Sequence, residues 1–199
     1  MIVNSQIGVL LSDHFAGLCM VQLPLEDAVL SLKRELSRFG PVVESETVEL
    51  RDALTRFGPV LSFPTNVLLC DCGEWTAVRS SSRISDDSAI AFGFTKQPGV
   101  VSAVFVARAD ERAFMYIKGA RTMRQVRVSD EGGVWVWLDD GDPLPFEGKY
   151  TARRKADRLT PEIVAGYCLT VTGVPFQSVW RRPGTRAVVF TRSTHEVQM

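Results

Sequence analysis

The sequence lacks the features that mark membrane proteins and exported proteins. Its 199 residues contain no apolar run of about 18 residues, the length that a membrane-spanning helix needs. The first residues, MIVNSQIGVLLSDHF, place no basic segment ahead of their short apolar stretch, as an export signal would. We therefore expect a cytoplasmic protein that has no membrane partner.

Cysteine and histidine are scarce: the chain has Cys19, Cys70, Cys72, Cys168, His14 and His195. So few cysteines, in a chain without an export signal, indicate buried thiols rather than a disulfide framework. Strand alternation would place the sulfurs of Cys70 and Cys72 on one face. A zinc site needs about four ligands, and both histidines are remote in sequence. The sequence therefore predicts no metal site.

The common catalytic motifs are also absent. The chain contains no GxSxG, Walker loop, GxGxxG or HExxH pattern, so phosphate and dinucleotide chemistry lacks its usual backbone cradle. Nucleophilic hydrolysis needs a base, and His14 lies in a loop-like stretch. The acidic groups at 86–87 and 139–142 have glycine and serine neighbours, which is typical of turns and caps. We predict no catalytic residue and no cofactor, and therefore a protein that is not an enzyme.

Composition indicates a folded chain. The sequence is 45% hydrophobic and 23% charged, both ordinary values for a globular protein. Its length favours one domain over 1–199. Within it we expect an N-terminal α/β subdomain over 1–62, an antiparallel sheet with a C-terminal helix over 63–192, and a flexible tail over 193–199.

The first 60 residues predict two strands and two short helices. The strands are expected at 7–11 and 17–23. The sequence Arg-Phe-Gly-Pro-Val occurs at 38–42 and again at 56–60, so two helices are predicted to end alike, each with a glycine cap and a proline stop. The first carries an apolar stripe from Leu25 to Phe39, and the second is expected to begin near Ser45.

Short β-prone runs dominate the rest of the chain, at 67–71, 74–79, 100–107, 113–118, 123–128, 134–138 and 186–191. Turn residues separate them, which favours an antiparallel meander. A helix is expected from Ser85 or Asp86 to Phe94, and another opens at Thr160-Pro161 and ends at Gly173. The fold class is therefore α+β, with an antiparallel sheet of about five to six strands and helices packed on it. We expect 123–128 and 134–138 to form a hairpin, with the helix from Pro161 packed against that sheet.

The most unusual stretch runs from 132 to 162. Its strand at 134–138 is apolar on both faces, because Trp135 and Trp137 alternate with aliphatic residues. Such a strand should be central and covered, or else present aromatic side chains to a partner.

A basic segment follows this strand, and it has two interpretations. Nucleic acid could bind its cations, with Trp137 and Tyr150 as stacking platforms, but the balance of 23 basic and 23 acidic residues disfavours nucleic acid. Alternatively, the arginines pair with acids such as Glu147 and pin the connection to the sheet. The candidate binding surface comprises Trp135, Trp137, Glu147, Tyr150, Arg153, Arg154 and Arg158.

Charge is uneven along the chain. Residues 1–60 carry 5 Lys/Arg and 8 Asp/Glu, a net charge of −3, whereas residues 118–192 carry 13 and 8, a net charge of +5. Such polarity suits a protein that docks a partner through a local patch. The acidic region would suit a basic partner and the arginine-rich region an acidic one, and of the two we favour the acidic region, because proteins that act on polyanionic substrates are basic.

One family resemblance rests on this part of the chain. Gly-Val-Trp-Val-Trp-Leu at 133–138 is followed by Gly-Asp-Pro-Leu-Pro-Phe-Glu at 141–147, then Tyr150, Arg153-Arg154 and Asp-Arg-Leu-Thr-Pro-Glu at 157–162. The pattern resembles uncharacterised bacterial cytoplasmic proteins, some of which are similar to immunity proteins of toxin systems. The resemblance implies a non-catalytic module whose partner is a cognate toxin domain. The alternative is a regulator that binds a small molecule or nucleic acid through Trp135, Trp137, Tyr150 and the arginines.

Overall fold

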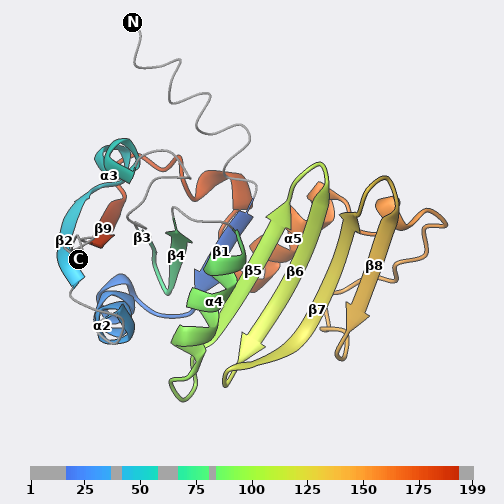
Figure 1. Cartoon of the computed structure of the whole chain (residues 1–199), viewed down its shortest axis with the longest axis horizontal. Coiled ribbons are helices and arrows are strands. Elements are labelled where there is room, and N and C mark those ends of the chain that lie inside the picture. The colour runs from blue at the N-terminus through green and yellow to red at the C-terminus, as the bar shows by residue number, and fades with distance from the viewer. Residues whose placement is uncertain (1–16, 37–41, 58–66, 81–83, 193–199) are drawn as a thin grey trace, which may run out of the picture.

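The computed structural model describes residues 17–36, 42–57, 67–80 and 84–192, which form one antiparallel sheet with helices on both faces (Figure 1). The strands are β1 (Gly17–Val21), β2 (Val42–Glu49), β3 (Val67–Cys72), β4 (Trp75–Ser80), β5 (Val101–Ala107), β6 (Glu111–Lys118), β7 (Arg121–Asp130), β8 (Trp135–Asp140) and β9 (Arg186–Arg192). Their order in the sheet is β2-β9-β3-β4-β1-β5-β6-β7-β8. The α+β class is confirmed.

The expected size of the sheet was wrong, because it has nine strands rather than five to six. The first part of the chain contributes to this same sheet. β1 pairs with both β4 and β5, and β2 pairs with β9. All five residues of β1 are buried, so this strand has apolar neighbours on both faces and hydrogen-bonding partners on both edges.

Ser45 lies within β2, so the helix expected to begin there starts later. The helix is α3 (Leu50–Phe57), and the polar run that precedes it extends along β9 instead. The expected strand at 7–11, both glycine-proline helix ends and the tail from 193 lie outside the described residues.

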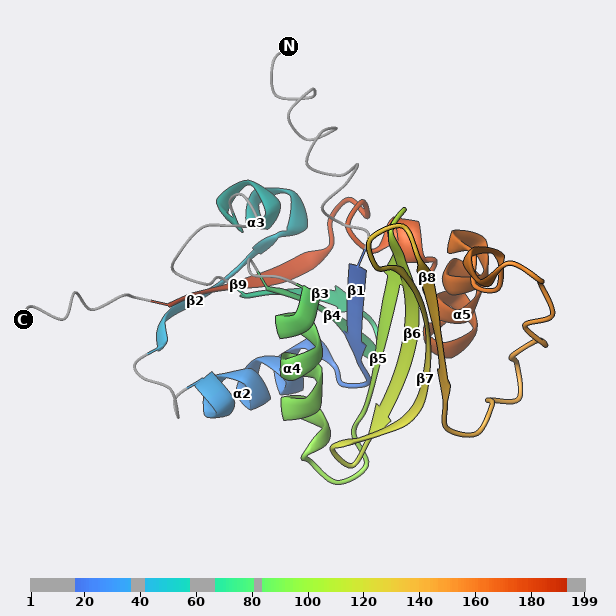
Figure 2. The same ribbon diagram turned by 45° about the vertical axis from the view of Figure 1, so that its right-hand side comes forward.

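Two apolar layers cover the two faces of the sheet. Side chains from α3, α5 (Pro161–Thr172) and the 3-10 turn η3 (Phe176–Ser178) form one layer with strand residues such as Phe105 and Phe114. The other layer comes from α2 (Leu25–Leu36) and α4 (Ile84–Thr95), with strand residues such as Val104 and Ile117. Figure 2 shows α2 and α4 on one side of the sheet and α5 on the other. No helix in the described ranges is both long and apolar enough to cross a membrane.

The α5 helix begins and ends as predicted. Thr160 is its N-cap, and its hydroxyl accepts a hydrogen bond from the amide of Ile163. Pro161 occupies the first turn, and Gly173 closes the helix in the left-handed conformation with φ 71°. These local signals act within a few residues of each helix end, which is why the sequence alone predicts them.

The predicted hairpin of β7 and β8 is confirmed, with Val128 paired to Trp137 and Asp130 to Trp135. The helix from Pro161 packs on this sheet, against β5 and β6. The central position expected for 134–138 was wrong, since β8 is the last strand of the sheet. Its two tryptophans are half-buried on the α5 side, whereas Val136 and Leu138 on the opposite face are exposed.

Candidate binding surface

Residues 141–160, here called the β8–α5 loop, connect the edge strand to the helix on the α5 side of the sheet (Figure 2). Apart from the 3-10 turn η2 (Lys155–Asp157), the loop has no regular secondary structure. Connections longer than about 12 residues are uncommon in compact domains unless they serve a function. Side chains from β6, β7 and α5 hold this loop in place.

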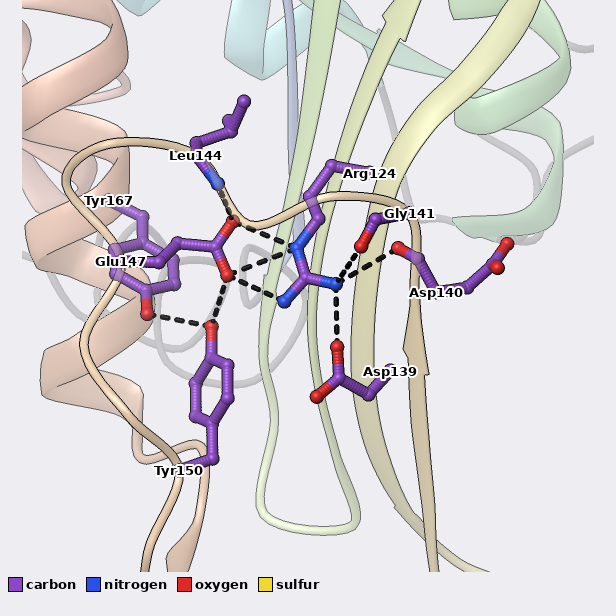
Figure 3. A network of polar contacts seen from close by, with 8 residues as sticks. All are labelled: Arg124, Asp139, Asp140, Gly141, Leu144, Glu147, Tyr150 and Tyr167. Atoms are coloured by element: carbon purple, nitrogen blue, oxygen red, sulfur yellow. Dashed lines mark hydrogen bonds and ion pairs between the residues drawn. The ribbon is translucent and has the colours of Figure 1, made fainter.

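A buried ion pair fixes the first half of the loop. Arg124 on β7 donates from Nε and Nη2 to the carboxylate of Glu147, with Nη2 2.7 Å from Oε2. The two side chains are 1% and 0% exposed. Figure 3 shows the guanidinium facing the carboxylate, so that two donors meet two acceptors.

The remaining donors of Arg124 hold the turn after β8. Its Nη1 lies 2.5 Å from a carboxylate oxygen of Asp139 and donates to the carbonyl oxygens of Asp140 and Gly141 at 3.0 and 2.9 Å. These anions and hydrogen bonds raise the pKa of Arg124 above its usual value despite burial. One arginine therefore ties β7, the end of β8 and the loop together.

Glu147 has further donors of its own. Its Oε1 accepts from the amide of Leu144 at 3.0 Å, and its Oε2 accepts from the hydroxyl of Tyr150 at 2.8 Å. Burial raises the pKa of Glu147, but the hydrogen bonds from Arg124, Leu144 and Tyr150 outweigh that effect and hold it below its usual value. The carboxylate stays ionised and fully engaged, so it cannot reach a substrate.

Tyr150 links the ion pair to α5. Its hydroxyl lies 2.7 Å from that of Tyr167, and because Tyr150 gives its proton to Glu147, Tyr167 is the donor in this bond (Figure 3). Burial, and the hydrogen bond that its hydroxyl donates to Glu147, raise the pKa of Tyr150. Tyr150 is thus a protonated structural group at neutral pH.

Two more arginines fix the second half of the loop. Arg158 donates from Nε to the carbonyl of Ala152 at 3.0 Å, and its guanidinium lies 5.5 Å from the ring centroid of Trp137. Arg112 on β6 donates to the carbonyl of Ala156 at 3.3 Å and lies 4.8 Å from the ring of Trp135. Cation–π contacts of this kind orient both tryptophan rings.

The structure brings together four of the seven residues predicted as a surface. Trp137 and Tyr150 pack with ring centroids 5.0 Å apart, Tyr150 contacts Glu147, and Arg158 covers Trp137. Trp135 precedes Trp137 by two residues on β8 and lies beneath Arg112. The expected pairing of Glu147 with an arginine of its own loop was wrong, because Arg124 takes that place.

Arg153 and Arg154 form no part of this packing. Together with Lys149 and Lys155 they are exposed, and within the described part of the chain none of these four side chains has a hydrogen bond or ion pair. We call these four residues the cationic rim. The loop beneath them is held by Arg124, Arg112 and Arg158, so the rim is a surface on an ordered support.

Sequence reasoning missed Arg124, although a signal for it exists. Arg124, Val126 and Val128 alternate along β7 and are all buried on one face. An arginine in phase with two core valines must find an anion there, because an unpaired buried charge is strongly destabilising. The sequence does not show which acidic residue pairs with Arg124.

The cysteine thiols are shielded from solvent. All four cysteines are buried free thiols, and burial raises the pKa of Cys168 to about 12. Cys70 and Cys72 lie on one face of β3, as alternation predicts. Among the described residues, no group of three or more His, Cys, Asp or Glu is placed to hold a metal ion.

A small cavity of about 220 Å³ lies between α2 and α4, with Leu32, Ile90 and Phe94 in its lining. Lys96 and Glu35 also line this cavity and form an ion pair, with Nζ of Lys96 3.8 Å from Oε2 of Glu35. The cavity is smaller than the roughly 300 Å³ at which ligand pockets begin.

Comparisons with protein families, with curated proteins and with solved structures find no match to this chain.

Proposed function

We propose that this chain is a non-catalytic protein-binding module of the immunity type, which neutralises a cognate bacterial toxin domain by covering its active or target-binding surface. The observation that carries the proposal is the cationic rim. Four exposed cations, whose side chains have no partner in the described ranges, lie on a loop that a buried ion pair holds in place. Pre-ordered charges bind a protein partner with little further loss of conformational entropy.

The contacts within the loop favour binding over catalysis. Glu147 is occupied by Arg124, Leu144 and Tyr150 and is not exposed. A general base must reach the proton that it takes, and this carboxylate reaches only its own structural donors. Inhibition by an immunity protein requires complementary shape and charge rather than a reactive group.

The alternative of a nucleic-acid or small-molecule regulator has less support. The ring of Trp137 packs against Tyr150 and lies beneath Arg158, and that of Trp135 lies beneath Arg112. Stacking on a base needs an open aromatic face, and each of these rings already has a guanidinium over one face. The cavity between α2 and α4 is small for a ligand.

The cationic rim also has more support as a docking surface than the acidic region in 1–60. In that region Glu26 is bound by Arg186, with Nη1 2.7 Å from Oε1, and Glu49 accepts from the amide of Gly184 at 3.1 Å. These two acids thus have partners, and only Asp27 and Asp52 of the region's described side chains are exposed without one. In contrast, all four side chains of the rim lack a partner among the described residues. The proposed partner therefore presents an acidic surface.

Co-expression in a sensitive host tests the proposal. Each polymorphic reading frame next to the gene would be expressed alone, with this chain, and with the variants R153E/R154E and R181E/R182E. Arg181 and Arg182 are exposed beyond η3, so the second variant matches the change in charge away from the rim. We expect one frame to be toxic alone, and the wild type and R181E/R182E to protect.

The double variant in the rim should lose protection at unchanged expression and unchanged melting temperature. If no neighbouring frame is toxic, or if toxicity persists with the wild type present, the immunity proposal is wrong and the regulator takes its place. Equal protection by both variants would place the interface away from the rim.

A further inference from the structure

The open edge of β8 has the features of a binding site for an extended segment. This inference rests on the proposed function, that this chain binds a protein. β8 is the last strand of the sheet, and no strand in the described ranges pairs with its outer edge. Open edges present unpaired amides and carbonyls, and native proteins usually protect them with charged side chains, proline or a bulge. β8, with the sequence WVWLDD, has no proline or bulge, and its only charged residues are Asp139 and Asp140 at its end.

The direction of the free backbone groups follows from the pairing of β7. The amide of Asp130 donates to the carbonyl of Asp110, on the β6 side, so the backbone groups of Asp130 point away from β8. Its partner Trp135 therefore belongs to a non-hydrogen-bonded pair. By alternation, the amides and carbonyls of Trp135, Trp137 and Asp139 point to the open edge.

The two faces beside this edge differ in chemistry. On one face Val134, Val136 and Leu138 are exposed, by 65%, 37% and 40%, and neither α2 nor α4 packs over them. On the other face η2 packs against β7 and β8, which brings Lys155 of the cationic rim next to the strand, and Arg154 directly precedes it in the chain. Figure 2 shows the β8–α5 loop extending outward on this side of the sheet.

We propose that an extended segment of the partner protein adds to β8 as a tenth strand, and that this segment alternates apolar and acidic residues. Side chains of an added strand alternate between the two faces. Those beside Val136 and Leu138 would bury apolar surface, and those on the opposite face would meet the cationic rim. Main-chain hydrogen bonds to Trp135, Trp137 and Asp139 supply affinity, and the two faces supply specificity.

A second copy of this chain fits the edge less well. Antiparallel pairing of two β8 strands in one continuous sheet relates them by a twofold axis perpendicular to that sheet, so both tryptophan faces would lie on the same side. The two cationic rims would then approach each other across the axis. Like charges brought together in this way oppose association.

A designed peptide serves as the probe. Fluorescein-labelled Glu-Val and Lys-Val repeats, each of four units, would be titrated into the full chain by fluorescence anisotropy. Variant V136S/L138S removes the apolar face, and L30S/L169S makes a matched change at exposed apolar positions on α2 and α5. We expect the acidic repeat to bind at least about tenfold more tightly than the basic one, and V136S/L138S alone to weaken it by about tenfold, a change of about 1.4 kcal/mol.

Amide hydrogen exchange identifies the site. With the acidic repeat bound, Trp135, Trp137 and Asp139 should gain protection, while β2 at the other edge should not. If the β8 amides gain no protection, or if both repeats bind equally, the inference is overturned. A dimer by sedimentation that V136S/L138S abolishes would also overturn it, because the occupant is then a second copy. A chain that neutralises a toxin with β8 unprotected would keep the proposed function and lose this inference.

Discussion

Arg124 and Glu147 lie side by side beneath the β8–α5 loop, with Nη2 2.7 Å from Oε2 and neither side chain open to solvent. If either residue is removed, the charge of the other stays buried, where water cannot solvate it. Replacing Glu147 with Ala should therefore destabilise the fold by about 3 to 5 kcal/mol.

Arg127 and Glu111 provide a matched control for this prediction. Arg127 lies three residues after Arg124 on β7, and its Nε is 2.8 Å from Oε1 of Glu111 on β6, but the two side chains are 40% and 25% exposed. Replacing Arg127 with Ala should cost less than about 1 kcal/mol. Urea unfolding of both variants is the measurement, and equal losses would contradict a structural role for the buried pair.

The carboxylate of Glu147 also predicts how the stability of the fold depends on pH. The folded state holds the pKa of Glu147 below its usual value, which is about 4.3 in an unfolded chain. The unfolded state therefore binds more protons in the acidic range, so the contribution is complete above that pH and is lost as pH falls through the folded pKa.

Urea unfolding at a series of pH values, from neutral to strongly acidic, would measure this loss for the wild type and for E147Q. The amide cannot titrate, so the variant should lose less stability on acidification. The other carboxylates are common to both chains and cancel in the comparison. Parallel curves would show that Glu147 is not held ionised by the fold.

Gly141 predicts a steric effect where β8 ends. Its φ is 80°, and a β-carbon there would collide with the carbonyl oxygen of Met123. Gly133 has a φ of 88° with no atom within 4 Å of such a carbon. Replacing Gly133 with Ala should cost about 1 to 2 kcal/mol for the left-handed backbone alone, and replacing Gly141 with Ala should cost clearly more. Thermal unfolding would measure both, and equal losses would contradict the close approach.

The parts of the fold that the sequence predicts depend on neighbours in the chain. Thr160 and Gly173 act on the helix end beside them, and the turn at 131–134 joins two alternating strands directly. The position of β8 at the edge and the pairing of β2 with β9 depend on the order of strands, which links segments far apart in sequence. The polar residues of β2 alternate weakly with apolar ones, so periodicity did not reveal a strand there.

The same distinction between local and long-range information applies to the candidate surface. Its members were recognised as aromatic and basic residues of one segment, but their roles depend on Arg124 and Arg112, which come from other strands. Composition alone cannot separate Arg158, which contacts Trp137, from Arg153, which contacts nothing described. Burial makes that distinction, and it requires the fold.

Arg158 and Arg153 therefore predict opposite outcomes of the same substitution. Arg158 is half-buried, holds the carbonyl of Ala152 and covers Trp137, so R158A should destabilise the fold by about 1 to 3 kcal/mol. R153A removes an exposed side chain and should leave stability within about 0.5 kcal/mol of the wild type. Thermal and urea unfolding would measure both. Unchanged stability of R158A with lost partner binding would make Arg158 a contact residue instead.

The last prediction concerns how the complex forms. If the cationic rim steers an acidic toxin domain, the attraction acts mainly on the association rate and is screened by salt. Stopped-flow mixing with the purified cognate domain should show an association rate that falls by about tenfold or more between about 0.05 M and 0.5 M salt. R153A/R154A should be slower at low salt and nearly equal to the wild type at high salt, while R181A/R182A should follow the wild type throughout. The two double variants remove the same charge from different places, so equal rates for both would show that overall charge, and not the rim, guides the encounter.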